Sequence, residues 1–304
     1  MRAGQLLPPL PLLAWEPTKN TLHLWAQIVG KVRLLTAPPL NHWWHAPLYV
    51  DLGGLTTRRL RRNGVSFQID LDLLGDTVRV RTDDRRVESF HLADGLSVAA
   101  FDRTLHECLA RLGVDLELVE VPFGVPMTTP FPQDVEHASY DPEYVHRFWH
   151  ILDWVDDVFQ EFCGWATCKT SPVQLFWHSF DLAATRFSGR PAPVAPDADP
   201  VTRQAYSHEV ISFGFWPGDP NVREPSFYCY AAPEPPGLTD RPLPGDAVWA
   251  PDGGMALLSY EAVRHAPDPR AALLAFLDAA YDAGAITAGW DREAFDSPHR
   301  PPRP

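Results

Sequence analysis

The side chains best suited to chemistry lie in the second half of the chain. His178, His208 and Glu209 are titratable groups within strongly apolar stretches, where an imidazole or a carboxylate can transfer protons or anchor a ligand. Pockets for small molecules combine apolar walls with a few polar anchors. We therefore expect catalytic roles for these three residues and ligand contacts from a wider set: Trp44, His45, Trp177, Asp181, Arg186 and Trp216.

The same residues also have a purely structural interpretation. Aromatic side chains on strands pack cores, and Arg186 with Glu209 can form a cross-strand ion pair that involves no ligand. Both interpretations, pocket and plain core, stay open at the level of sequence.

Two other kinds of chemistry fit the sequence poorly. His146 and His150 share a helical face, but no Glu follows His146 as it does in zinc peptidases. The serines lie outside any Gly-x-Ser-x-Gly turn, and Cys163 lacks the context of a thiol protease. We expect no metal site, and the residues indicate no particular cofactor.

The spacing of His178 and His208 bears on whether they act together. If 173–187 and 206–216 are strands joined by a turn centred near residue 196, His208 pairs near Ala184. At about 3.3 Å per residue, the two imidazoles then lie about 20 Å apart. A shared ligand would need a bulge or a different register.

The elements that must position these residues begin with a helix. Apolar residues recur at three- and four-residue steps over 18–35, which predicts an amphipathic helix that Pro38-Pro39 ends. Period-two runs separated by turn residues then predict an antiparallel meander over 40–52, 65–73, 77–83 and 86–92. A second helix is expected over 98–112, closed by Gly113, followed by a strand over 115–121.

The second half repeats this order. Asp141-Pro142-Glu143 is typical of a helix start, and a last helix is expected over 269–283. Four strands are expected between the two helices, over 173–187, 206–216, 226–232 and 254–260. The predicted fold class is α+β, with two tandem pseudo-duplicated halves, each a helix, an antiparallel four-stranded meander and a helix.

A residue-level echo supports the duplication. At an offset of 133, Pro39, Asn41, Trp44 and His45 fall on Pro172, Gln174, Trp177 and His178. We expect both Trp-His steps on the first strand of their halves, facing a cleft between them. Strand alternation places His178 in an enclosed apolar space, where burial favours the neutral imidazole.

Composition is that of a packed unit without a membrane segment. The 304 residues are 45% hydrophobic, and no stretch reaches the roughly 18 apolar residues of a membrane span. The net charge of −13 comes from 122–304, where 25 Asp and Glu accompany 12 Lys and Arg, and this disfavours nucleic acid. Four cysteines without close pairing favour a reducing compartment. We expect a first half over 1–121, a second over 122–304, Pro-rich loops at 190–200 and 233–251, and a disordered tail over 298–304.

Four strings are specific enough to indicate a family. They are HWWHAPLY at 42–49, HASYDPE at 137–143, FDLA with TRFSG within 180–189, and YSHEVISFGFWPG at 206–218. Through them the sequence resembles a bacterial family catalogued as a domain of unknown function, DUF5996, from about Trp15 to about Trp290. The resemblance implies one undivided unit in a bacterial cytoplasm and brings no activity, cofactor or catalytic residue with it.

We expect a cytoplasmic protein that binds a small organic molecule in an aromatic, histidine-lined cleft, and that can act on it by histidine acid–base chemistry. Two alternatives stay open: a non-catalytic ligand-binding or regulatory protein, and an interaction subunit that uses its acidic C-terminal face. No nucleic-acid or membrane partner is expected. The residues indicate neither the substrate nor the oligomeric state.

Overall fold

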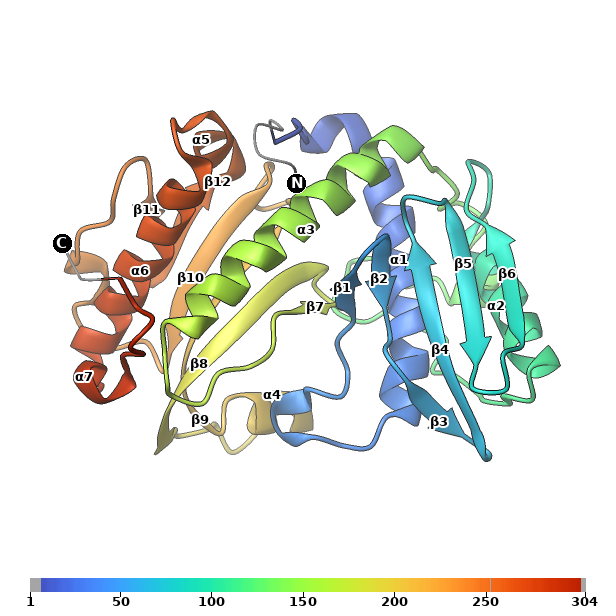
Figure 1. The fold of residues 1–304 in the computed structure, drawn as a ribbon, viewed down its shortest axis with the longest axis horizontal. Helices are drawn as coiled ribbons and strands as arrows, with labels where there is room; N and C mark the ends of the chain where they lie inside the picture. The colour runs from blue at the N-terminus through green and yellow to red at the C-terminus, as the bar shows by residue number, and fades with distance from the viewer. Residues whose placement is uncertain (1–6, 252, 302–304) are drawn as a thin grey trace.

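The chain forms two antiparallel sheets flanked by long helices, which confirms the α+β class (Figure 1). The computed structural model describes residues 7–251 and 253–301. The first half contains α1 (Leu12–Thr36), β1 (Tyr49–Asp51), β2 (Gly54–Thr56), β3 (Leu60–Arg62), β4 (Val65–Asp72), β5 (Thr77–Thr82), β6 (Val87–His91) and α2 (Val98–Arg111). The second contains α3 (Pro142–Gly164), β7 (Gln174–Phe176), β8 (Asp181–Pro191), α4 (Pro200–Ala205), β9 (His208–Trp216), β10 (Ser226–Ala232), β11 (Val248–Trp249), β12 (Met255–Ser259), α5 (Tyr260–His265), α6 (Pro269–Thr287) and α7 (Arg292–Phe295). Short 3-10 turns are η1 (Asn41–Trp43), η2 (Phe131–Gln133) and η3 (Leu238–Asp240).

Each sheet has six strands rather than the predicted four. In the first sheet the order is β1, β2, β4, β5, β6, with β3 also paired to β4, and in the second it is β7, β8, β9, β10, β12, β11. The additional strands have two or three residues, which is too short for a period-two pattern to appear. Leu48 and Leu175 exchange main-chain hydrogen bonds of 2.9 and 2.8 Å, and this bridge joins the two sheets.

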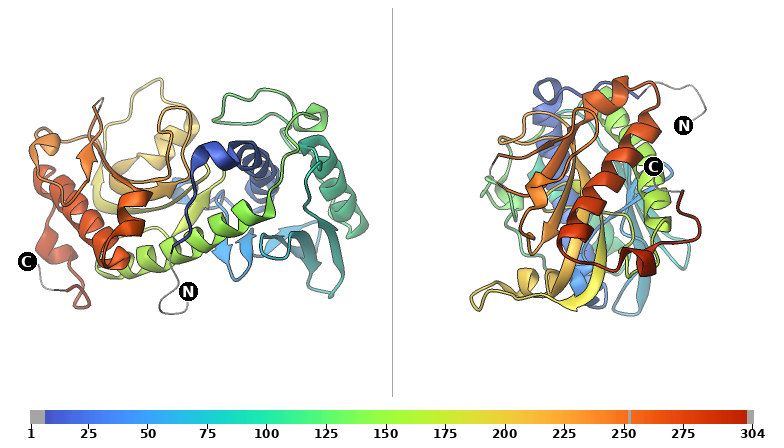
Figure 2. Two further views of the ribbon diagram at one scale, coloured as in Figure 1. Left: turned by 90° about the horizontal axis from the view of Figure 1, so that it is seen from above. Right: turned by 90° about the vertical axis from the view of Figure 1, so that its left-hand side faces the viewer.

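Each sheet presents a row of apolar side chains to its helices. Cross-strand pairs align Leu55, Leu71, Val78 and Phe90 in the first sheet, and Leu182, Phe215, Phe227 and Leu258 in the second. The first row lies under α1 and α2, and the second lies under α3 and α6, on opposite sides of the molecule (Figures 1 and 2). Removal of these apolar surfaces from water is the main driving force for this arrangement.

A buried polar stripe on α1 holds loops from both halves. Lys19, His23, Gln27 and Lys31 follow one another at four-residue steps and are all buried. Their side-chain nitrogens lie 2.8 to 2.9 Å from main-chain carbonyl oxygens of Gly218, Trp177, Phe123 and Val121 respectively. Since an unpaired buried carbonyl is costly, the stripe stabilises loops that have no other regular partner.

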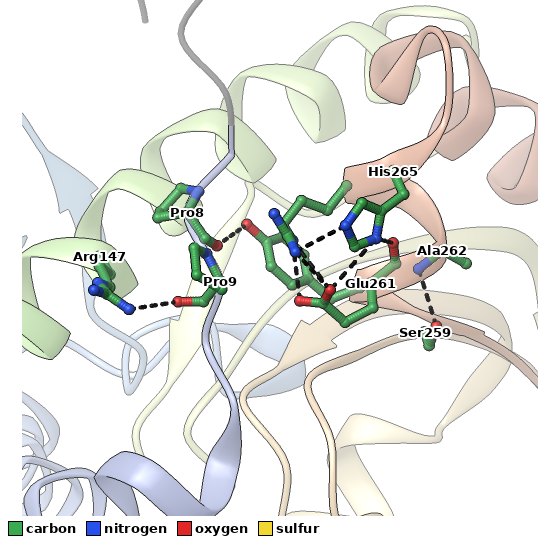
Figure 3. A network of polar contacts seen from close by, with 9 residues as sticks. Pro8, Pro9, Arg147, Ser259, Glu261, Ala262 and His265 are labelled. Atoms are coloured by element: carbon green, nitrogen blue, oxygen red, sulfur yellow. Dashed lines mark hydrogen bonds and ion pairs between the residues drawn. The ribbon is translucent and has the colours of Figure 1, made fainter.

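The segment before α1 is also held by the second half (Figure 3). The Tyr260 hydroxyl donates to the carbonyl of Pro8 at 2.8 Å, and Arg147 on α3 donates to that of Pro9 at 3.3 Å. Within the residues that the structure describes, no helix is both long and apolar enough to cross a membrane.

Four local predictions from the sequence are wrong. Residues 40–47 form η1, turns and irregular backbone instead of a strand, and 115–121 has no strand. The predicted strand over 173–187 is a hairpin, because Phe180 adopts a left-handed φ of 59° and its N–H bonds to Phe176 O at 2.7 Å. His208 pairs with Pro191 rather than near Ala184, since a bulge follows Phe187.

The echo between Trp44-His45 and Trp177-His178 does not correspond to equivalent positions. The first pair precedes β1, and the second lies in the loop after β7. The expected disordered tail over 298–304 contains Arg300, whose guanidinium forms an ion pair with Asp278 at 2.6 Å, while 302–304 lie outside the described residues.

Candidate functional site

The second sheet has one covered face and one half-open face. Along β12 the burial alternates, with Ala256 and Leu258 buried beneath the helices and Met255 and Leu257 half-exposed on the other side. Cross-strand register carries this half-exposed side over the neighbouring strands. We call it the open face and define it by Phe176, Asp181, Trp216, Tyr228, Tyr230 and Met255.

Tyr228 crosses the sheet to reach Asp181 on β8. The two residues lie on strands separated by β9, and Gly214 of β9 is the direct neighbour of Tyr228. A Cβ on Gly214 would lie 2.4 Å from the ring and the hydroxyl of Tyr228, so only glycine leaves the path free. The Tyr228 hydroxyl donates to Asp181 Oδ2. Burial, and then the charge of Asp181, raise the pKa of Tyr228 well above its ordinary value, so this hydroxyl keeps its proton.

Asp181 receives a second hydrogen bond from the hairpin that precedes β8. Ser179 Oγ donates to Asp181 Oδ1, and His178 Nε2 lies 3.5 Å from the same Ser179 oxygen. Burial lowers the pKa of His178, while the charge of Asp181 opposes this change. The neutral imidazole expected from the sequence is therefore favoured, although His178 lies in a turn instead of on a strand.

A second set of hydroxyls continues along the open face. Tyr230 lies over the next row of the sheet, and its hydroxyl is 2.8 Å from that of Tyr206, which follows α4. Ser212 is the cross-strand neighbour of Tyr230. The hydroxyl oxygens of Ser212 and Thr185 are 2.9 Å apart. The rings of Tyr228 and Tyr230 stack at 6.0 Å between centroids, so the two sets are continuous.

A shallow depression adjoins this array. It has a volume of about 370 Å³ and lies beside Tyr230, Glu234, Gly254 and Met255. Trp216 packs against Tyr228 with 4.9 Å between ring centroids, and it is half-exposed. The open face thus offers aromatic surface, hydroxyls and a carboxylate within one region.

The hairpin carrying His178 is fixed from below by α1. His23 donates from Nε2 to Trp177 O at 2.9 Å and stacks on Phe180 at 4.8 Å between ring centroids. Burial lowers the pKa of His23 to about 3, and the charge of Lys19 acts in the same direction. The indole of Trp177 donates to Ala46 O at 3.0 Å, so this predicted ligand contact is a buried support of the hairpin.

Arg186 and Glu209 do not contact each other and do not belong to the open face. Arg186 is fully buried beneath the helices, where its guanidinium carbon lies 3.9 Å from the Phe162 ring centroid and 4.4 Å from that of Tyr281. Glu209 pairs with Arg190 at 2.6 Å. Burial raises the pKa of Glu209, but hydrogen bonds from Arg190 and Ser188 outweigh this, and the net change is a lower pKa. The predicted ion pair is therefore wrong because the two side chains point to different neighbours.

The remaining predicted residues lie away from His178. His45 is buried, accepts a hydrogen bond from Leu40 N–H at 3.2 Å on Nδ1 and stacks on Trp43. Trp44 and His208 both lie near His42, with 5.4 and 5.9 Å between ring centroids. Because His208 pairs with Pro191 at the opposite end of β8 from Asp181, it is about 30 Å from the hairpin that carries His178.

Of the predicted residues, His178, Asp181 and Trp216 thus meet at one place. Sequence reasoning missed the roles of Gly214, Ser212, Tyr206 and His23. A signal for two of them was present: Ser212, Gly214 and Trp216 alternate along one strand, as Tyr228 and Tyr230 do along the next.

A larger groove elsewhere is less suited to a specific ligand. It has a volume of about 670 Å³ and lies along α2, lined by charged side chains that include Asp102, His106, Glu107 and Glu120. His106 Nδ1 already donates to the Asp102 carbonyl at 2.9 Å. Among the described residues, no group of three or more His, Cys, Asp or Glu side chains is placed to hold a metal ion.

Comparison with known proteins gives one match. A family model described as "Family of unknown function (DUF5996)" matches residues 7–297. No curated protein and no solved structure matches the chain.

Proposed function

The chain belongs to the DUF5996 family, whose function is unknown, and from the geometry of its open face we propose that it binds a small uncharged organic molecule there. The observation that carries the proposal is the hydrogen bond from Tyr228 across Gly214 to Asp181. A glycine in a strand and a buried carboxylate both lower the free energy of unfolding. A core with no ligand to bind would be more stable with other residues at these two positions. A binding surface gains from the glycine and the carboxylate, because they fix the orientation of the tyrosine hydroxyls and rings.

The groups on the open face favour a ligand with hydroxyls and an apolar side. Trp216, Tyr230 and Met255 are half-exposed and offer flat or flexible apolar contact. The polar groups beside them are tyrosine hydroxyls, one of which is oriented by the buried carboxylate of Asp181, and hydroxyls suit neutral hydrogen-bonding partners. The acidic excess of the second half disfavours anions. A sugar or another cyclic polyol has the required combination.

Hydrogen-bond directions support binding more than catalysis. In a serine nucleophile system the imidazole lies between the hydroxyl and the carboxylate. Here Ser179 lies between His178 and Asp181 and donates to the carboxylate, so its oxygen is not activated by the imidazole. The non-catalytic alternative raised by the sequence is therefore the one that we favour.

Native mass spectrometry of protein isolated directly from its source tests the proposal. We expect a retained neutral molecule, and calorimetric titration with monosaccharides and cyclic polyols should identify its class. Trp216→Ala and Asp181→Asn should each weaken the binding at least tenfold, which corresponds to about 1.4 kcal/mol.

The matched controls are Arg81→Ala and Asp70→Asn, which remove similar groups from the first sheet and should leave binding unchanged. Equal loss in both sets of variants, or no saturable binding by any probe, would contradict a site on the open face.

We also propose that the two halves arose by duplication of one unit. The support is the order of elements and the two matched rows of apolar residues, rather than the Trp-His echo. When the first half of an alignment of family members is compared with the second half, the strands that carry the two rows should be similar in sequence. A similarity no greater than that between strands with randomly reordered residues would count against a common origin.

We further propose that the protein works in the cytoplasm of a bacterial cell. Cys108, Cys163, Cys168 and Cys229 are free thiols, and burial raises the pKa of Cys163 and Cys229 to about 12. Alkylation of protein from its source, denatured without reductant, should modify four thiols. Consistent recovery of fewer would indicate an oxidising compartment.

A further inference from the structure

The three lysines of the chain have unusual partners. The sequence contains 26 basic residues, yet only Lys19, Lys31 and Lys169 are lysines. Ion pairs with carboxylates among the described residues are made by arginine or histidine, and no lysine takes part in one. Lys19 and Lys31 donate to main-chain carbonyls. Lys169 is the exposed one, and its partner is an imidazole.

Lys169 and His42 form a defined donor–acceptor pair. Lys169 Nζ lies 2.8 Å from His42 Nε2, and His42 Nδ1 lies 3.1 Å from Gln204 O. A carbonyl only accepts, so Nδ1 carries the proton and Nε2 presents its lone pair to the lysine. Burial lowers the pKa of His42, and the charge of Lys169 lowers it further, which keeps the imidazole neutral.

Two aromatic rings lie beside the amine. Lys169 Nζ lies 5.2 Å from the ring centroid of Trp44 and 5.1 Å from that of Phe187. His208 meets His42 edge-on, with 5.9 Å between ring centroids, and it is the other titratable group at this place. Burial lowers the pKa of Lys169 below its ordinary value, which increases the fraction of neutral amine near pH 7.

The backbone that presents His42 is strained. His42 and Trp43 have φ angles of 55° and 62°, and two successive left-handed residues that are not glycine are rare. Such strain persists only where the surroundings enforce it, and it is frequent at functional sites. The strain places the His42 ring between Gln204 and Lys169, in the HWWH string of the chain.

We propose that Lys169 is a nucleophilic amine that forms an imine with small aromatic aldehydes, and that His42 accepts and returns the proton. The site is at the end of β8 opposite Asp181, so it does not use the hydrogen bond between Tyr228 and Asp181. The half-exposed ring of Trp44, which packs on the buried Phe187, provides the flat apolar contact that an aromatic aldehyde needs.

The step balances without any further reagent. Water takes one proton from the ammonium group of Lys169, and the free amine attacks the aldehyde carbon. His42 Nε2 then takes one proton from the acidic nitrogen of this adduct, while the water returns its proton to the adduct oxygen, which gives a neutral carbinolamine. The protonated His42 then gives its proton to the carbinolamine hydroxyl. The C–O bond breaks, water leaves, and a C=N bond to Nζ forms as a protonated imine.

Reductive trapping tests this assignment. The full chain is treated with 1-naphthaldehyde and sodium cyanoborohydride at pH 7, and modified peptides are quantified by mass spectrometry. The variant Arg59→Lys provides an internal reference, because position 59 is exposed. Lys169 should be modified about tenfold faster than the side chain introduced at position 59, because more of its amine is neutral at this pH. The pH midpoint of its modification should also be lower.

The variant His42→Gln separates proton transfer from simple exposure. It should slow the modification of Lys169 about tenfold, because the adduct loses its proton acceptor, while the rate at position 59 stays the same. Modification of Lys169 at the rate of the reference in the wild-type background overturns the proposal, as does an unchanged rate in a folded His42→Gln. If that variant does not fold, the wild-type comparison of rate and midpoint still decides.

Discussion

The two sheets have similar strand orders but very different free faces. On the free face of the first sheet, Arg81 pairs with Asp70 at 2.7 Å and Arg79 with Asp72 at 3.0 Å, and both arginines are exposed. On the open face of the second sheet, Tyr228 and Asp181 are buried and hydrogen-bonded to each other. The first face consists of solvated ion pairs, each of which contributes little to the free energy of unfolding. On the second face, a buried carboxylate lowers the free energy of unfolding but fixes the orientation of a tyrosine hydroxyl. Because of this difference we propose the binding site on the second face.

The largest expected contrast is between the pH responses of His23, which supports the second sheet, and His106, which lies on α2 beside the first sheet. His23 supports the hairpin of the second sheet, and its pKa falls from 6.5 to about 3 on folding. Stability is then present above pH 6.5 and is lost as pH falls toward 3, by about 3 kcal/mol between pH 6.5 and 4. Urea unfolding at several pH values should show this loss, and His23→Gln should flatten it.

On α2 the sign is opposite. A hydrogen bond from His106 to the carboxylate of Asp102 raises the pKa of His106, so the contribution of His106 to stability is complete below the unfolded pKa and is lost as pH rises through the folded pKa. His106→Gln should therefore remove stability at low pH only. If the free energy of unfolding had the same pH dependence in His23→Gln and His106→Gln, the opposite pKa shifts assigned to the two histidines would be contradicted.

The next largest effect concerns the carboxylates of the two free faces. Asp181→Ala removes the acceptor of the buried Tyr228 hydroxyl and should lower the free energy of unfolding by about 2 kcal/mol. Asp70→Ala, which removes an exposed ion pair, should cost less than about 1 kcal/mol. If urea titrations give equal losses, the two faces do not differ in the way described.

A smaller effect is expected from one methyl group. Gly214→Ala places a Cβ 2.4 Å from the Tyr228 ring and should cost about 1.5 kcal/mol through displacement of that ring. Gly164→Ala, at the end of α3 where a Cβ meets nothing within 4 Å, is the matched control and should be neutral or stabilising. Thermal unfolding distinguishes them, and a neutral Gly214→Ala would show that Tyr228 has an alternative position.

The smallest effect is the coupling of an exposed pair. A double-mutant cycle on Arg81 and Asp70 should give less than about 1 kcal/mol, and the value should decrease further in 1 M salt. A salt-independent coupling above that value would mean that the first sheet also has a preorganised face.

The helices and the longer strands could be predicted from the sequence because their signals are local. The helix expected over 98–112 is α2 at Val98–Arg111, and the strands expected over 65–73 and 77–83 are β4 and β5 within one residue. The errors occurred where a non-local contact decides. Phenylalanine rarely adopts the left-handed backbone conformation that Phe180 has, so the residue type gives no signal for it. The bulge after Phe187 changes which residue pairs with His208.

The same cause explains the outcome for the candidate site. Asp181 and Trp216 were identified because aromatic and acidic residues alternate with apolar ones along their strands. Arg186 was misplaced although its odd separation from Asp181 along the predicted strand already puts the two side chains on opposite faces of the sheet. The role of Gly214 depends on a side chain two strands from Asp181, which spacing along the chain does not reveal.

The buried stripe of α1 has a consequence for synthesis on the ribosome. Lys19 and His23 leave the exit tunnel long before their partners Gly218 and Trp177. In the same way, Pro8 is synthesised long before Tyr260, which donates a hydrogen bond to it. At about 5–20 residues per second, the interval between α1 and residue 218 is roughly 10–40 s. During that time the helix exposes both its apolar side and its unpaired polar stripe. The nascent chain therefore depends on its last third to complete its first helix, and a prematurely terminated product would be a substrate for chaperones and proteases.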